Sequence, residues 1–281
     1  MTAVAARGAV KAELSRKQRT LCLLFLVLFC ASGVFDHSLW APNDSHEGAM
    51  IAESYRTGHW TELKYYGEPF LEKPPLLHWT ALAFCTLFGR LNVGLVRLPS
   101  ALFGLATALV VWAWGLRLGR ERAGILAAFL CATNIAYYEH SRVVLTDICL
   151  TFAVTVCLWA FSSAYDAEEP KLGRYALFLV ATGGSFYAKG LVGPVFIMGS
   201  VVVFLAMNRR WALACALPLV FAPILVAITL PWVAALYRDG GREYLLSAFV
   251  GVNLMQASIT GFCPAAMIFK ALGLRSGCAF E

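Results

Sequence analysis

The sequence predicts an all-α fold, a polytopic membrane helix bundle with about seven spans and with interfacial helices in the first external loop. Of its 281 residues, 59% are hydrophobic and only 14% are charged, and the mean hydropathy is +0.68. A soluble domain carries about 25% charged residues. Apolar stretches, the longer ones near the roughly 20 residues of a spanning helix, also recur along the chain. They lie at residues 20–36, 76–89, 98–116, 123–138, 143–165, 175–188, 191–207 and 211–236.

Short basic clusters orient these stretches, because cytoplasmic loops carry an excess of Lys and Arg. The polar and basic segment 1–19 should therefore be cytoplasmic, and an uncleaved first span should follow it. The basic segments 116–122 and 207–211 should also lie inside. A full crossing by 76–89 would place 116–122 outside. Because that stretch has only 14 residues, we expect it to lie in the interface or to dip in and return.

The chain is expected to divide into five parts along this topology. They are a cytoplasmic tail (1–19), a first span (20–36), an external loop with interfacial helices (37–97), a six-span bundle (98–236) and an external tail (237–281). Seven charged residues then come to one membrane face, although none of them was used to orient the chain. They are Asp44, Glu47, Glu72, Lys73, Arg142, Asp147 and Lys189.

The external loop is expected to begin with an amphipathic helix over residues 43–58. Asn43, Asp44 or Ser45 could cap its N-terminus, and Gly58 could end it. On the residues alone, Asp44 can be explained as a cap and nothing more. A carboxylate at a helix N-terminus is stabilised whether or not it takes part in chemistry.

The pair Glu72–Lys73, directly before Pro74 and Pro75, admits two interpretations. It can be an ion pair at the lipid headgroups, with the prolines setting the start of a helix. Alternatively, Lys73 holds a phosphate and Glu72 a metal ion or another cation. A lysine is a suitable partner for a lipid phosphate at this depth.

Two more charged residues border apolar stretches, where ionisable groups are costly and usually functional. Asp147 begins such a stretch, and Arg142 lies five residues earlier and could pair with it. Lys189 could extend its ammonium to the interface as an ordinary snorkelling lysine. Because Asp147 and Lys189 are expected at the same end of two antiparallel helices, they could also be partners.

Several other classes of site find no support in the sequence. The nine cysteines form no CxxC pair, so we expect neither a disulfide framework nor a zinc cluster. The five histidines form neither HxxxH nor HExxH, and no P-loop, GxGxxG or GxSxG motif is present. The net charge of +6 is spread over short clusters between apolar stretches, so we expect membrane lipids rather than nucleic acid as partners.

Five blocks of the sequence follow the order and spacing of one known group of proteins. They are APNDSHEGAMIAESYRTGHW, GEPFLEKPPLLHWTALAFCTLFG, VRLPSALFG, SRVVLTD and AKG, in that order. The chain resembles the aminoarabinose transferase and protein O-mannosyltransferase group, which are membrane glycosyltransferases of the GT-C fold. The resemblance covers about residues 20–260, and EKPPLLHW and RLPSALFG are its most specific parts.

The resemblance implies a transfer reaction at the external face of a membrane, taken here as the bacterial inner membrane with the site facing the periplasm. A sugar would move from a polyprenyl-phosphate carrier to a lipid, glycan or protein acceptor, with inversion in one displacement. The external loop 37–97 would then be catalytic. Apolar walls from the spans would hold the prenyl tail.

The resemblance also assigns roles to the acidic residues. Asp44 matches the acid near the catalytic centre and is the first choice as general base for the acceptor hydroxyl. Glu47 is the fallback for that position. Asp147 matches a second acid of the family, so all three are candidate catalytic residues.

The resemblance also gives the cationic residues a role, which is to bind the sugar donor. Lys73, Lys189 and Arg142 are the candidates for binding the donor phosphate, whose departure needs charge neutralisation more than a proton. Glu72 matches a residue that can contact metal. A divalent metal ion is therefore the one candidate cofactor.

Two departures from the family leave alternatives open. Members of the group are usually much longer, so we expect a C-terminal truncation within 237–281. Near residues 250–256 the family often has His or Asn followed by Arg three residues later, whereas this chain has Asn253 and Gln256. A catalytically inactive remnant or a carrier-lipid-binding subunit is the alternative. A transporter is disfavoured, because the charges gather at one face and no repeated halves are seen.

Overall fold

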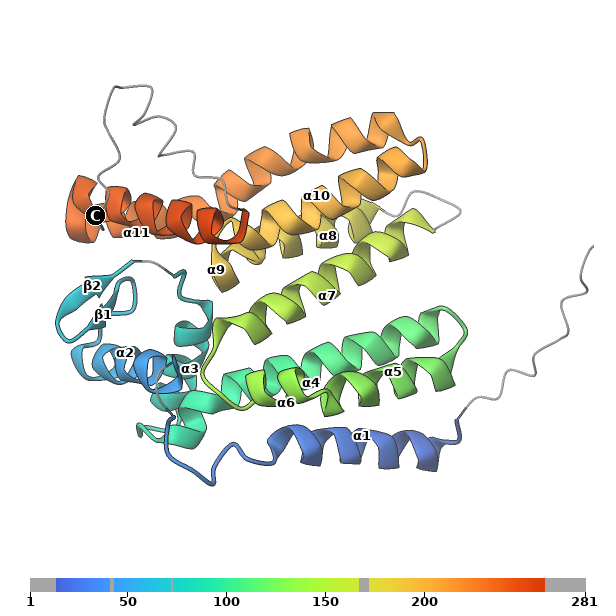
Figure 1. Cartoon of the computed structure of the whole chain (residues 1–281), viewed down its shortest axis with the longest axis horizontal. Coiled ribbons are helices and arrows are strands. Elements are labelled where there is room, and N and C mark those ends of the chain that lie inside the picture. The colour runs from blue at the N-terminus through green and yellow to red at the C-terminus, as the bar shows by residue number, and fades with distance from the viewer. Residues whose placement is uncertain (1–13, 41–42, 72, 167–171, 261–281) are drawn as a thin grey trace, which may run out of the picture.

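The computed structural model describes residues 14–40, 43–71, 73–166 and 172–260, with the backbone alone at 43 and 247–260. These residues form helices and one two-stranded hairpin, which confirms the all-α expectation apart from that hairpin. The elements are α1 (Arg16–Ala31), α2 (Asn43–Thr57), β1 (Leu63–Tyr65), β2 (Glu68–Phe70), α3 (Leu76–Leu87), α4 (Val93–Arg117), α5 (Glu121–Thr133), α6 (Ile135–His140), α7 (Thr146–Tyr165), α8 (Leu172–Gly184), α9 (Phe186–Lys189), α10 (Val192–Met207) and α11 (Trp211–Thr260). Figure 1 shows α2, the hairpin and α3 gathered at one end of the longer helices.

Three of the described helices are long and apolar enough to cross a membrane: α4, α7 and the part of α11 over Trp211–Leu246. The shorter apolar helices are α3 and α10. With 12 residues, α3 would rise only about 18 Å, which fits the interfacial position expected for residues 76–89. The count of seven spans stays a prediction.

The helix ends differ from the expected boundaries for identifiable reasons. The first helix ends at Ala31, and Gly33 follows with a φ of +80°. The fourth helix begins at Val93 rather than 98, because the Asn92 side chain caps it and its charged Arg97 is buried. Residues 237–260, expected as the start of a tail, continue α11 beyond a non-helical residue, Gly241.

Long-range contacts define one end of the bundle. The Glu121 carboxylate accepts a hydrogen bond from the backbone N–H of Leu14 and pairs with Arg19 at 2.7 Å. The Arg117 guanidinium lies 3.6 Å from the Asp166 carboxylate. Residues 14–19 of the first basic segment and the basic segment 116–122 therefore lie at the same end, as the orientation from basic clusters predicts.

The α4–α5 hairpin is held by a close approach of two glycines. A Cβ atom at Gly115 would lie only 2.2 Å from the Cα of Gly124. Small residues let membrane helices approach closely, where dispersion and weak hydrogen bonds stabilise their packing. This contact fixes the turn at the basic end.

The opposite end is built on one apolar core. The hydrophobic cluster beneath it joins α2, α3, α4, α7 and α9, which are far apart in sequence. Its buried members are Ile51, Leu77, Ala81, Leu82, Cys85, Leu95, Val96, Val144, Ile148, Cys149 and Ala188. Burial of this apolar surface places the N-terminal ends of α2, α3 and α7 beside one another.

The hairpin is the element that the sequence did not predict. Tyr66 and Gly67 form its turn with φ values of 53° and 85°, the conformation of a tight type I′ turn. The backbone N–H of Gly67 donates to the Glu53 carboxylate of α2 at 3.1 Å. The Trp232 indole N–H of α11 donates to the carbonyl of Thr61 at 3.3 Å. The segment leading to Lys73 is thus attached on two sides.

Candidate functional site

Asp44 lies in the first turn of α2 and is buried, with 3% of its side chain exposed. One carboxylate oxygen accepts from the backbone N–H of Val144 at 2.7 Å, and the other accepts from Trp40 at 3.0 Å and from Arg97. Arg97 is fully buried in α4 and also donates to the carbonyls of the loop before α2. The interpretation of Asp44 as a helix cap alone is therefore wrong.

Glu47 follows Asp44 by one helical turn and lies between two basic side chains. Its carboxylate is 2.6 Å from the Lys73 ammonium and 2.7 Å from Nε2 of His78. Burial raises the pKa of the Glu47 carboxyl, but the contacts with His78 and Lys73 outweigh it and lower the pKa to about 2. Glu47 is therefore a stable anion that holds Lys73, rather than a base near neutral pH.

Asp147 and Lys189 form an accessible ion pair. Their charged atoms are 2.6 Å apart, and 39% of the Asp147 side chain and 22% of the Lys189 side chain are exposed. The pairing confirms that α7 and α9 bring these two residues together. Of the three predicted acids, Asp147 is the one whose carboxylate is open enough to meet an acceptor.

Arg142 takes a different place from the one expected. Its five N–H groups donate to the carbonyls of Phe29, Ser32 and Tyr138 and to the hydroxyls of Ser32 and Ser141. The guanidinium also lies over the Tyr138 ring. The suggested pair with Asp147 is thus replaced by the Asp147–Lys189 pair. With its donors occupied, Arg142 fastens the C-terminal end of α1 to the loop before α7.

The predicted metal contact cannot be placed, since Glu72 lies outside the described residues. Within the described ranges, no group of three or more His, Cys, Asp or Glu side chains is arranged to hold a metal ion. Asn253 and Gln256 lie in the part of α11 for which the structure describes the backbone alone.

Two residues of the site were missed from the sequence, Arg97 and His78. His78 lies inside the apolar stretch 76–89, and Arg97 directly precedes the stretch 98–116. An ionisable residue in or beside an apolar stretch is the signal by which they could have been found. Both are fully buried and contact a predicted acid, Asp44 and Glu47 respectively. In the structure, two predicted acids are therefore buried against basic side chains.

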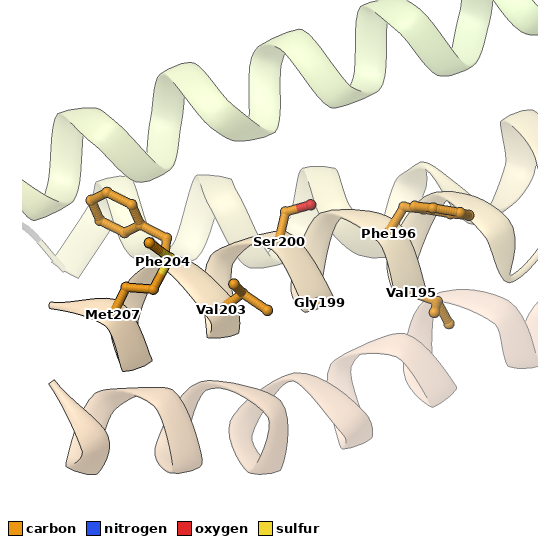
Figure 2. Close-up of a pocket in the computed structure, with 7 residues that line it drawn as sticks. All are labelled: Val195, Phe196, Gly199, Ser200, Val203, Phe204 and Met207. Atoms are coloured by element: carbon orange, nitrogen blue, oxygen red, sulfur yellow. The ribbon is translucent and has the colours of Figure 1, made fainter. Parts of the chain in front are cut away.

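An apolar groove of about 510 Å³ runs along α10. Its lining residues are Val195, Phe196, Gly199, Ser200, Val203, Phe204 and Met207, and Figure 2 shows them spaced along the helix. Because α10 begins directly after the Lys189–Gly190–Leu191 reversal, the groove extends away from the end that holds Lys189 and Asp147.

The chain is similar to solved membrane glycosyltransferase structures in fold. It superposes on ArnT from Cupriavidus metallidurans bound to undecaprenyl phosphate with a TM-score of 0.72 and 21% identity, covering 81% of this chain and 43% of that one. The S. cerevisiae protein O-mannosyltransferase Pmt1–Pmt2 complex bound to the sugar donor gives 0.53 and 18%, covering 86% and 35%. The expected GT-C type of helix bundle is confirmed.

Curated relatives are undecaprenyl phosphate-α-4-amino-4-deoxy-L-arabinose arabinosyl transferases. The Edwardsiella ictaluri protein is 28% identical over 221 residues, which cover 77% of this chain and 40% of that protein. The Pseudomonas fluorescens transferase 1 is 26% identical over 229 residues, covering 77% and 39%. The chain thus spans about 40% of the length of these relatives. Residues 72–235 match the family described as dolichyl-phosphate-mannose-protein mannosyltransferase, and the chain belongs to that family.

Proposed function

We propose that the chain is a membrane glycosyltransferase that moves a sugar from a polyprenyl-phosphate donor to a lipid, glycan or protein acceptor. The observation that carries the proposal is the presence, at the same end of the bundle, of two partly exposed ammonium groups and a partly exposed carboxylate. They are Lys73, Lys189 and Asp147. The arabinosyl transferases to which the chain is similar are named for an undecaprenyl-phosphate-linked sugar, which supports this class of donor.

The reaction would be a single displacement at the anomeric carbon of the donor. The acceptor oxygen forms a bond to that carbon, the bond from the carbon to the phosphate oxygen breaks, and the polyprenyl phosphate leaves with the electron pair. Lys73 and Lys189 would stabilise the charge that develops on the phosphate. The acceptor proton would pass to a carboxylate, and Asp147 is our choice for it because Asp44 is buried and fully bonded.

Asp44 and Glu47 would support the site rather than touch the acceptor. Asp44, through Arg97 and Val144, fixes α2 against α4 and the loop before α7. Glu47 would hold Lys73. Glu72 stays our candidate contact for a divalent cation. The groove along α10 is our candidate seat for the isoprenoid chain, since an apolar tail is favoured against apolar side chains.

We further propose that the chain lies in a bacterial inner membrane with this end of the bundle outside. The basic segments at the opposite end support the orientation. Single-cysteine labelling with an impermeant reagent tests it at Tyr66, in the exposed hairpin turn, and at Leu118, in the turn at the basic end. Tyr66 should react from outside in intact cells and Leu118 only after permeabilisation; the reverse would overturn the orientation.

The experiment for the function itself is polyprenyl phosphate binding by the purified chain in detergent, followed by a sugar-transfer assay. Wild type should bind, and Lys73→Ala should weaken binding by about tenfold or more, as expected for a lost charge-assisted bond. Lys17→Ala, on exposed α1 at the opposite end, is the matched control. Binding without any transfer would support the carrier-lipid-binding alternative, and absence of binding would contradict a donor site.

A further inference from the structure

Glu47 lies between two basic side chains that differ sharply in accessibility. The Lys73 side chain is 23% exposed, whereas that of His78 is fully buried. Each carboxylate oxygen faces one of them, Oε1 facing the ammonium at 2.6 Å and Oε2 facing Nε2 of the imidazole at 2.7 Å. Only the lysine can reach a ligand, so the histidine can act on a ligand only through the carboxylate.

The surroundings of His78 exclude a direct role. Its neighbours in α3, Leu77 and Ala81, are part of the buried apolar cluster. Among the described residues, neither imidazole nitrogen makes a hydrogen bond, and neither does Oε2 of Glu47, so Nε2 and Oε2 are in close polar contact rather than hydrogen-bonded. A buried polar atom without a partner is costly, so the imidazole is held at this position by its contact with Glu47 and by packing. An imidazole with no open face can neither bind substrate nor exchange protons with it.

Glu47 and His78 together also affect the positive charge that Lys73 presents to a ligand. A carboxylate at 2.6 Å offsets most of the ammonium charge and competes with an incoming phosphate for it. A protonated imidazole 2.7 Å from the second oxygen of Glu47 attracts part of the carboxylate charge toward the interior. This attraction also holds the carboxylate in place, so that the ammonium stays at the opening.

We propose that His78 is a positioning residue for Lys73 and acts on donor phosphate binding through Glu47. The inference rests on the proposed role of Lys73 as the donor phosphate ligand. It predicts that His78 matters for phosphate affinity only while Lys73 is present. A histidine that merely filled space in the core would weaken binding regardless of the residue at position 73.

The experiment is a double-mutant cycle on the full chain in detergent, with undecaprenyl phosphate as the ligand. His78→Leu should weaken binding by about tenfold, which corresponds to the loss of one buried charged contact. His78→Gln, whose amide N–H group can donate a hydrogen bond to Glu47, should restore most of that affinity. In the Lys73→Ala background, His78→Leu should change affinity by less than about twofold, because coupled residues are not additive. His59→Leu, an exposed histidine in the same loop, is the control.

The outcomes separate this inference from the proposed function. If Lys73→Ala binds as wild type does, the donor-phosphate role of Lys73 fails. If Lys73→Ala loses affinity but His78→Leu does not, or if the two losses add fully, the positioning role of His78 is overturned. Should His78→Leu fail to fold, His78→Gln and His78→Asn, each made with and without Lys73→Ala, still test the positioning role of His78. Equal losses from both amides that persist without Lys73 would refute the proposal.

Discussion

Asp44 of α2 and Arg97 of α4 form an ion pair in which 3% and 0% of the side chains are exposed. The pair joins the start of the loop helix to the beginning of a long apolar helix, 53 residues further along the chain. Breaking one partner of a buried pair leaves an uncompensated charge, which is far more costly than removing both.

Arg97→Met should therefore lower the free energy of unfolding by about 3–5 kcal/mol. The double variant with Asp44→Asn should lose less than the sum of the two single variants, because no isolated charge remains. Thermal unfolding of the purified chain in detergent checks both, with the exposed Arg90→Met as control. An Arg97→Met chain as stable as wild type would show that the pair carries no such energy.

Asp147→Asn should reduce the rate of sugar transfer by about 100-fold or more, since removal of a general base typically costs this much. Binding of the polyprenyl phosphate should remain, because Lys73 and Lys189 are kept. Asp166→Asn is the matched control, since Asp166 follows the opposite end of α7. Full activity of the Asp147→Asn chain would move the base role to another residue.

Arg142→Lys should lower the free energy of unfolding by about 2–4 kcal/mol, because a lysine cannot replace five N–H groups in fixed directions. In the folded fraction, affinity for undecaprenyl phosphate should stay near the wild-type value. Calorimetric unfolding and ligand titration of the same preparation measure the two effects. A stable variant with lost phosphate affinity would instead support the ligand role that the sequence suggested.

Gly115→Ala should destabilise the α4–α5 hairpin, because its new methyl would meet the Gly124 backbone. Overpacking of this kind costs about 1–3 kcal/mol. Gly173→Ala places its methyl in open space and should be neutral or slightly stabilising. Unfolding temperatures of the two variants, measured in the same detergent, test this difference. Equal values would mean that the α4–α5 hairpin can widen without cost.

Glu47 should make stability depend on acid pH. Its pKa falls from 4.5 to about 2 in the folded chain, so the ionised carboxylate stabilises the fold above about pH 4.5. That contribution, about 3 kcal/mol from the size of the shift, is lost as the pH falls toward 2. Unfolding temperatures between pH 5 and pH 2.5 should drop more steeply for wild type than for Glu47→Gln. The exposed Glu139→Gln should follow the wild type, and parallel curves for all three would contradict the buried pairing.

The sequence by itself determined the helical membrane character and the grouping of charges at one end. It also predicted the helix over 43–58, and it offered the partnership of Asp147 and Lys189 as one of several alternatives. These features depend on hydropathy, basic clusters and cap residues, which act over a few neighbouring positions or over the two membrane faces. The interfacial position of the stretch 76–89 was expected because the stretch is short and because a full crossing would place 116–122 outside. The short helix α3 fits this position.

The tertiary structure alone decided which acids are open and which are enclosed. Asp44 meets Arg97, Glu47 meets His78, and Arg142 meets the end of α1, each across 31 to 113 residues of chain. No local pattern encodes such partners, because each is selected when apolar surfaces from distant helices pack and the remaining charges must be paired within reach. That packing leaves Asp147, Lys73 and Lys189 partly exposed, and so decides where chemistry can take place.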